Sequence, residues 1–199
     1  MQITWPELTA SASVGYSPVT SYNIYVQVGT FVYLANVAAQ VNPTSSYLHT
    51  AVTAGQSYTY QISAVNIFGE GVRSAASAAI LASLAPLKLA SATVIIIGGD
   101  VRVLWPATAN DYGSAVTSYK ILFKDKTVNY VESPFCDGTA AFSISNRSCS
   151  LAMGNFTRTM ASGGLYELST GTPVIAAVRA QNGIGYSIQS DDNTVYGVA

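Results

Sequence analysis

A strict alternation of apolar and polar residues, closed by a turn, constrains the fold of this chain more than any other sequence feature. The apolar and aromatic positions of the alternation are Tyr58, Tyr60, Ile62 and Ala64. A period of two residues is typical of a strand with one buried face. Asn66, Gly69 and Gly71 follow, and these residue types favour turns and tolerate positive φ. The stretch therefore predicts a half-buried strand that leads into a tight loop.

A second copy of this pattern lies in the C-terminal half of the chain, at residues 171–185. Both copies end in Ala-x-Asn before a glycine-rich turn, at residues 64–66 and 180–182. This ending resembles the F strand and the F–G loop of fibronectin type III domains. The resemblance implies an all-β chain of two tandem immunoglobulin-like sandwiches.

Further matches show that the repeat extends over most of the chain. Trp5-Pro6 matches Trp105-Pro106, and residues 16–24 match residues 112–121. The offset between the copies grows from 97 residues at Tyr22 and Tyr119 to 116 residues at the final asparagines. We therefore predict one domain at residues 1–85 and a second at residues 86–199, meeting near Pro86. The second domain carries an insert at about residues 131–169.

Five aromatic residues are the expected anchors of the two cores. Trp5 and Trp105 lie in expected strands that resemble strand B of the fibronectin type III fold, which carries its core tryptophan. Tyr22 and Tyr119 open the alternating strand that follows. Tyr58 stands three residues after Gly55, a spacing that resembles the tyrosine corner, in which a phenol bonds to an upstream backbone group. In the second copy Val174 replaces this tyrosine. Copy one is further expected to form strands near residues 31–34, 47–50 and 72–82.

The insert contains the two cysteines of the chain. Cys136 and Cys149 would close a short loop as a disulfide, and two reduced thiols in the core are the alternative. Residues 142–144 and 149–151 are expected to form a small hairpin with its tip at residues 145–148. An insert with Cys136 and the run Asn146-Arg-Ser-Cys-Ser also resembles repeats in large protist cell-surface proteins.

Two N-glycosylation sequons lie in the same insert, at Asn146 and Asn155. Their position beside the two cysteines, which would form a disulfide, favours an extracellular or cell-surface location, because glycans and disulfides both belong to the secretory route.

Composition and motifs argue against several classes of function. Charged residues make up 10% of the 199 residues and the net charge is −1, so neither nucleic acid nor an anionic membrane is an expected partner. No apolar run approaches the roughly 20 residues that span a bilayer. His49 is the only histidine, and no metal-binding or nucleophile motif accompanies it. We therefore expect no enzyme activity, no cofactor and no metal site.

Three functions are compatible with these features. The first is a structural or adhesive module of an extracellular glycoprotein assembly, as a filament subunit or a repeat segment. Its partners would be further copies of the chain, neighbouring domains of a longer chain and covalently attached glycans. The second is a module that binds a ligand such as carbohydrate at exposed tyrosines. The third is an accessory domain of a secreted enzyme.

The first strand of the sandwich distinguishes the two copies. Copy two has residues 88–97 for this strand, whereas copy one has only four residues before Trp5. A sandwich without this strand would expose unpaired backbone groups and part of its core. We expect the strand to come from upstream in a longer chain or from another subunit, which favours a head-to-tail contact. A shortened edge that needs no partner is the alternative.

Overall fold

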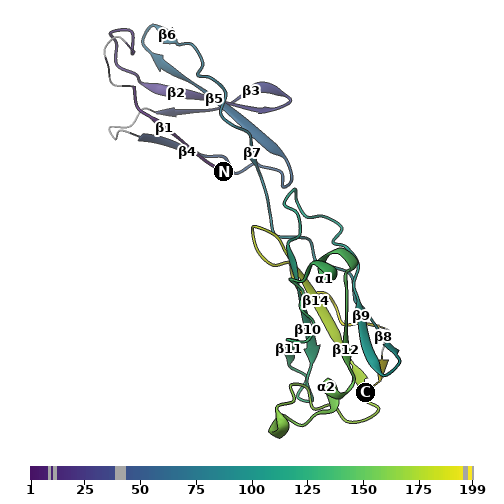
Figure 1. Cartoon of the computed structure of the whole chain (residues 1–199). Coiled ribbons are helices and arrows are strands. Elements are labelled where there is room, and N and C mark those ends of the chain that lie inside the picture. Colours follow the sequence, from purple (N-terminus) through teal and green to yellow (C-terminus); the bar gives the residue numbers. More distant parts are fainter. Residues whose placement is uncertain (9, 11–12, 39–43, 195–196, 199) are drawn as a thin grey trace. The chain divides into compact units, whose positions relative to one another are not determined.

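The computed structural model describes residues 1–8, 10, 13–38, 44–194 and 197–198 (Figure 1). The chain forms two compact units, residues 1–83 (unit 1) and residues 84–199 (unit 2). The division between them lies beside Pro86. Both units are built from antiparallel strands, which confirms the all-β class and the tandem β-sandwich architecture.

Unit 1 consists of a two-stranded sheet and a larger sheet. Their strands are β1 (Gln2–Pro6) paired with β4 (Thr44–Leu48), and the series β3 (Thr30–Ala38), β2 (Ser21–Val28), β5 (Ser57–Asn66) and β6 (Gly69–Glu70), with β7 (Ile80–Leu81) also on β5. The period-two pattern sets the register of the central pair, because Ile24 lies opposite Ile62 and Tyr22 opposite Ala64.

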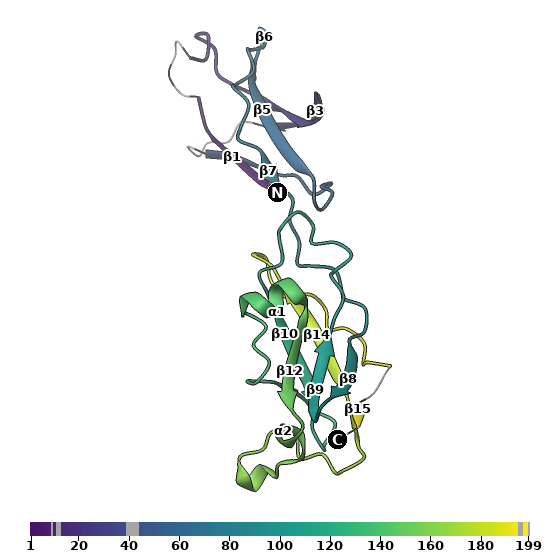
Figure 2. The same ribbon diagram turned by 45° about the vertical axis from the view of Figure 1, so that its right-hand side comes forward.

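Unit 2 repeats the pairing of the central strands, and its counterpart of the two-stranded sheet has a third strand (Figure 2). Its sheets are β8 (Thr93–Ile97), β9 (Asp100–Leu104) and β12 (Ser148–Ala152), then β11 (Tyr130–Glu132), β10 (Ser118–Lys124) and β14 (Ala176–Gln181), and the short pair β13 (Pro173–Val174) and β15 (Gly197–Val198). Three short helices complete the unit: α1 (Ala141–Asn146), α2 (Gly154–Thr157) and the 3₁₀ turn η1 (Met160–Ser162).

The predicted hairpin in the insert is wrong. Residues 142–144 belong to helix α1, in which the Ser145 hydroxyl donates to the carbonyl of Ala141 at 2.8 Å. Arg147 ends the helix in the left-handed region, with φ 48°. The strand expected at residues 149–151 exists, but it pairs with β9, as β4 pairs with β1 in unit 1. Strand β12 is thus part of the common sandwich, and the added residues lie before and after it.

All five predicted anchors are buried in the structure. Trp5 packs edge-on against Tyr22 with ring centroids 5.5 Å apart, and Trp105 packs in the same way against Tyr119 at 5.3 Å. Tyr58 is also buried, and its hydroxyl accepts a hydrogen bond from the Thr53 backbone N–H at 2.6 Å. Phenol and upstream backbone therefore meet as in a tyrosine corner.

In unit 1 a regular strand was expected at residues 72–82, but only β7 forms there. The last segment of unit 2 is irregular in the same way. The chain instead bonds to the neighbouring strand through every third residue. Ser190 donates its backbone N–H to the carbonyl of Val178, and the N–H of Val178 donates to the Ser190 hydroxyl oxygen, both at 3.0 Å. The same double contact is made by Ser74, Ser77, Ser187 and Asn193. A Ser-x-x-Ser spacing cannot follow the two-residue period of a regular strand, which is why the prediction failed.

Candidate modification and interaction sites

The disulfide is the covalent feature of the insert. Cys136 and Cys149 are bonded, with their Cα atoms 5.6 Å apart, and both are buried in the core of unit 2. The bond ties the segment before α1 to β12. Gly138 brings this segment close to β10, because a Cβ at this glycine would lie 1.8 Å from the Tyr119 carbonyl oxygen. Bond and close approach together fix the base of the loop that carries Asn146.

Asn146, the first predicted glycosylation site, is exposed at the end of α1. Its side-chain amide donates to the Phe142 carbonyl at 3.0 Å and to the Ser145 hydroxyl at 3.1 Å. Ser148, the third residue of the sequon, is buried at the start of β12. The folded protein therefore presents the asparagine to solvent and hides the hydroxyl that a glycosylating enzyme must recognise. Glycan addition at Asn146 would have to precede the closing of this loop.

Asn155, the second predicted site, lies in helix α2 and is half-buried. Its neighbour Phe156 is fully buried and stacks on Tyr166 with ring centroids 5.0 Å apart. Thr157 is exposed. The two sequons thus occupy different environments, one at a loop end and one on the surface of an aromatic cluster.

His49 has a structural role. Its Nδ1 lies 2.9 Å from the Tyr60 hydroxyl, and its ring meets Tyr58 edge-on at 5.6 Å. Burial, and then the charge of the N-terminal ammonium group, lower the pKa of the imidazole. A neutral ring packed between two tyrosines has no access to a substrate. Among the described residues, no group of three or more His, Cys, Asp or Glu side chains could hold a metal ion.

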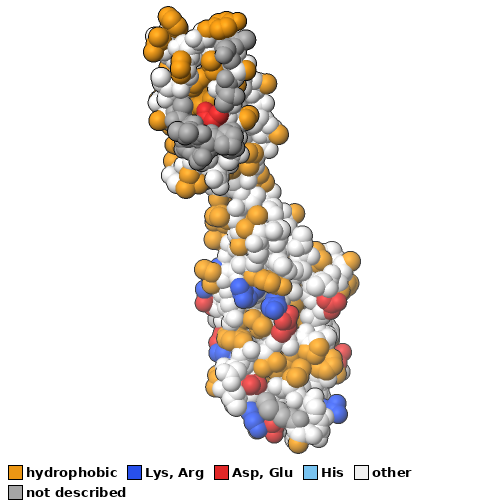
Figure 3. Space-filling model, turned by 90° about the vertical axis from the view of Figure 1, so that its left-hand side faces the viewer, with side chains coloured by type: hydrophobic (Ala, Val, Ile, Leu, Met, Phe, Trp, Pro, Cys, Tyr) orange, Lys and Arg blue, Asp and Glu red, His pale blue; other side chains and the backbone are white. Residues whose placement is uncertain are grey.

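The surface of unit 1 is apolar and nearly without charge. Only three of the 19 charged residues of the chain, Glu7, Glu70 and Arg73, precede Leu84. In Figure 3 hydrophobic side chains are visible at the end of unit 1 that carries β6. The exposed large hydrophobic residues near this end are Leu8, Tyr16, Ile67, Phe68 and Val72, of which Val72 is 97% exposed. Clusters of this kind mark interaction surfaces.

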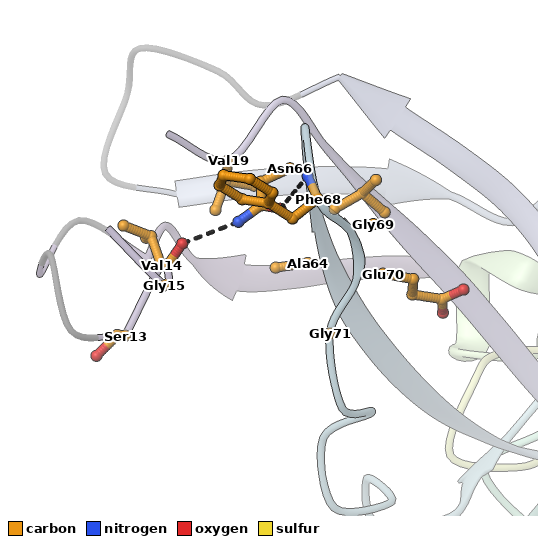
Figure 4. A pocket seen from close by; sticks show the side chains of 11 residues that line it. Ser13, Val14, Gly15, Val19, Ala64, Asn66, Phe68, Gly69, Glu70 and Gly71 are labelled. Atoms are coloured by element: carbon orange, nitrogen blue, oxygen red, sulfur yellow. Dashed lines mark hydrogen bonds between the residues drawn. The ribbon is translucent and has the colours of Figure 1, made fainter. Parts of the chain in front are cut away.

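Two cavities open near these residues. The first, of about 240 Å³, lies at the loop that joins β5 to β6 (Figure 4). Asn66 organises it, since its side-chain amide donates to the Val14 carbonyl at 3.0 Å and its side-chain oxygen accepts from the Phe68 N–H at 2.9 Å. The second cavity, of about 470 Å³, is lined mainly by apolar and aromatic residues that include Trp5, Tyr22, Ile62, Ala64 and Val72. Sequence reasoning missed both cavities, because each forms between segments that lie far apart in the sequence.

The exposed sheet face of unit 2 has a different character. Lys120 forms an ion pair with Glu132 at 2.7 Å, and Lys124 forms one with Asp192 at 2.6 Å. Tyr186 lies beneath Lys120, and Tyr130 lies beneath Lys124. Both of these rings are therefore covered by a cation. This arrangement does not form the open aromatic row that the carbohydrate-binding alternative requires.

Comparisons with known proteins identify the fold. No protein-family description matches the sequence, and no curated protein is similar to it. The FN1–FN3 domains of chicken CNTN1 share 15% identity over 92% of this chain and 58% of theirs, with a TM-score of 0.44. Domains A168–A170 of titin share 18% identity over 88% of this chain and 53% of theirs, with a TM-score of 0.52. The chain thus spans little more than half the length of these structures.

The resemblance to protist surface repeats gains no support from either structure. No described helix is long and apolar enough to cross a membrane. With the strand plan described above, the titin likeness supports one structural conclusion: the chain has the fold of tandem fibronectin type III or immunoglobulin-like β-sandwiches.

Proposed function

We propose that this chain is a non-enzymatic structural module of an extracellular glycoprotein assembly, in which unit 1 makes the principal protein contact. The observation that carries the proposal is the surface of unit 1, where three charged residues accompany the exposed cluster of Leu8, Tyr16, Ile67, Phe68 and Val72. Contact with other proteins is the favoured state of such a surface. The disulfide and the exposed Asn146 support the extracellular part of the proposal.

The experiment for the assembly role compares equivalent loops of the two units. Phe68 and Ile184 are both exposed, and each lies two residues after the asparagine that the two copies share. We expect the chain to associate with rising concentration in sedimentation velocity, and Phe68→Ser to weaken this association. Ile184→Ser is the matched control and should leave it unchanged. A chain that stays monomeric at every concentration, or equal effects of both variants, would contradict the assembly role.

The experiment for the extracellular role is peptide mass spectrometry of the protein secreted from a eukaryotic host. We expect glycan mass on the peptides with Asn146 and Asn155. Ser148→Ala and Thr157→Ala are the controls, because each removes the sequon hydroxyl and leaves the asparagine. Unmodified asparagine at both positions in secreted material would argue against a glycoprotein. The assembly experiment does not depend on this outcome.

A further inference from the structure

Unit 1 has a strand edge that its counterpart in unit 2 does not have. In unit 2, β9 pairs with β12 on one side and with β8 on the other. In unit 1, β1 pairs with β4 along all five of its residues, and no other described strand pairs with it. One edge of β1 therefore offers free backbone donors and acceptors, which is the usual template for an added strand.

The open edge coincides with incomplete burial of the unit 1 core. When the two copies are aligned at Asn66 and Asn182, Ile62 corresponds to Val178 and Ala64 corresponds to Ala180. Val178 is 1% exposed and Ala180 is fully buried, whereas Ile62 and Ala64 are both only partly buried. Through the two tryptophans, Ile3 corresponds to Val103, and here too only the residue of unit 2 is fully buried.

In unit 2 the segment at residues 84–97 covers these positions. Leu89, Ala92 and Val94 are at most 3% exposed and belong to the same apolar cluster as Trp105 and Tyr119. Val94 lies opposite Val103 in the β8–β9 pair. The segment thus supplies both a strand and three core side chains.

The backbone of this segment also meets the shared asparagine. Asn182 donates its amide to the carbonyls of Leu84, Asp111 and Ser114, and the bond to Leu84 is the shortest, at 2.7 Å. Asn66 makes the bond to Val14 that corresponds to the bond to Asp111. The positive φ values of Gly15 and Tyr16 match those of the residues that follow Asp111.

The two cavities of unit 1 lie where the segment would be. The cavity of about 470 Å³ is lined by Trp5, Tyr22, Ile62 and Ala64, the counterparts of residues in the cluster that contains Leu89 and Ala92. The cavity of about 240 Å³ lies beside Asn66, as the Leu84 carbonyl lies beside Asn182 (Figure 4). Open edge, partial burial and both cavities therefore have a single explanation.

We propose that unit 1 is a receptor for an extended segment with the residue pattern of Leu84–Ile97, supplied by a neighbouring module whose own sandwich does not contain it. The segment pairs antiparallel with β1 and places its counterpart of Val94 opposite Ile3. Its counterparts of Leu89 and Ala92 fill the larger cavity. Recognition comes from backbone pairing and apolar shape, since Lys88 is the only charged residue in this stretch.

The β8 segment of a second copy is not the occupant. Its Leu89 and Val94 are already buried in its own unit, at 1% and 0% exposure. Lending them would open one core to close another, with no net gain of buried surface. The occupant is therefore a segment that is not already folded into a sandwich.

The test adds a synthetic peptide with the sequence of residues 84–97 to the intact chain and follows hydrogen exchange by mass spectrometry. We expect slower exchange in residues 1–8 and 57–66, and no change in β9, whose edges are already paired. A peptide with Val94→Asp should bind at least about tenfold more weakly, because it places a charge in the core. The matched peptide with Thr93→Asp, altered at an exposed position, should bind like the original.

A variant on the receptor side separates binding from folding. Val72 lines the larger cavity at 97% exposure, so Val72→Asp should weaken peptide binding and leave the unit folded. Val32→Asp, at a 54% exposed position of β3, is the control and should bind the peptide normally.

Three results would overturn the proposal. They are no protection of β1 at saturating peptide, equal protection by the Val94→Asp peptide, and protection that arises without peptide as the chain dimerises. The last would assign the edge to a second copy. The inference builds on the proposed role as a module, but peptide binding is measured on purified chain and does not depend on glycans or on association through Phe68.

Discussion

The two units follow one strand plan and fill it differently. Among the described residues, the core cluster of unit 1 contains six buried hydrophobic residues, and that of unit 2 contains nineteen. The interior of unit 1 is mostly aromatic and polar-tipped, with Tyr22, Tyr58 and Tyr60 each bonded through the hydroxyl. The comparison teaches that this fold needs its strand pairing and a central tryptophan, whereas the rest of the core varies.

Hydrogen bonds compensate unit 1 for its smaller apolar core. The Tyr22 hydroxyl accepts from the Leu8 N–H at 3.0 Å, and burial raises the pKa of this phenol. Unit 2 relies on apolar contacts instead, such as Phe123 against Phe156 at 5.0 Å. Because burying apolar surface is the larger stabilising contribution, we expect unit 2 to unfold at the higher denaturant concentration.

Truncating the tryptophans should produce the largest effects. Trp105→Ala should destabilise unit 2 by about 5 kcal/mol and Trp5→Ala should destabilise unit 1 by about 3 kcal/mol, the upper and lower ends of the usual range. The difference follows from the cavity that already adjoins Trp5. Hydrogen exchange resolved by segment reports each unit separately. A larger loss from Trp5→Ala would reverse the ranking of the two cores.

Removing the disulfide should have the second largest effect, and only in unit 2. The double variant Cys136→Ala, Cys149→Ala should lower the stability of unit 2 by about 3 kcal/mol, because the cross-link restricts a short loop in the unfolded chain. Chemical denaturation of the variant and of the oxidised protein measures this difference. Unit 1 is the internal control, and a comparable loss there would show that the units are coupled.

Removing the serine contacts should lower the stability of the two units by smaller amounts, which differ between the units. Ser190→Ala leaves the N–H of fully buried Val178 without its side-chain acceptor, at a cost of about 1–3 kcal/mol. Ser74→Ala affects Ile62, which is partly exposed, so water replaces the hydroxyl and the cost is about 0.5–1 kcal/mol. Thermal unfolding of both variants tests the ranking, and Ser190→Thr should retain most of the stability. Equal losses of stability would mean that the burial of the backbone N–H group does not determine the cost.

The smallest expected effect is a pH dependence confined to unit 1. The pKa of His49 is lowered from its ordinary 6.5 in the folded state, chiefly by burial, so the unfolded chain binds the proton more readily. The stability of unit 1 should be complete above pH 6.5 and decline as the pH falls through that value. Denaturation of unit 1 at pH 7.5 and at pH 5 measures the decline, which His49→Gln should remove. A decline of equal size in unit 2, which has no histidine, would exclude this cause.

Periodicity and repeats were sufficient to predict the fold class. The alternation from Tyr58 to Ala64 and its copy at Val174 to Ala180 gave the central strands, because a half-buried strand imposes its period on the sequence. The failures occurred where the bonds are local or come from side chains. Helix α1 has six residues and shows no apolar period, and the serine-bonded segments follow a period of three.

The candidate interaction sites were less accessible to sequence reasoning. The sequons and the cysteines are visible in the sequence, but their environments are not. An example is the burial of Ser148 beside the exposed Asn146. The expectation that copy one takes its first strand from elsewhere stays a prediction. The cavities beside Ile62 and Asn66 form between segments that are distant in the sequence, and no local pattern encodes how those segments pack.

The serine-bonded segments have a consequence for solubility. At the outer border of each large sheet, the residues between the paired serines, such as Ala75 and Ala76, come two at a time and not in alternation. An incoming β-strand needs a partner group at every second residue, so it finds no matching register along this border. This border of each sandwich is thereby guarded against indiscriminate pairing with strands of other molecules.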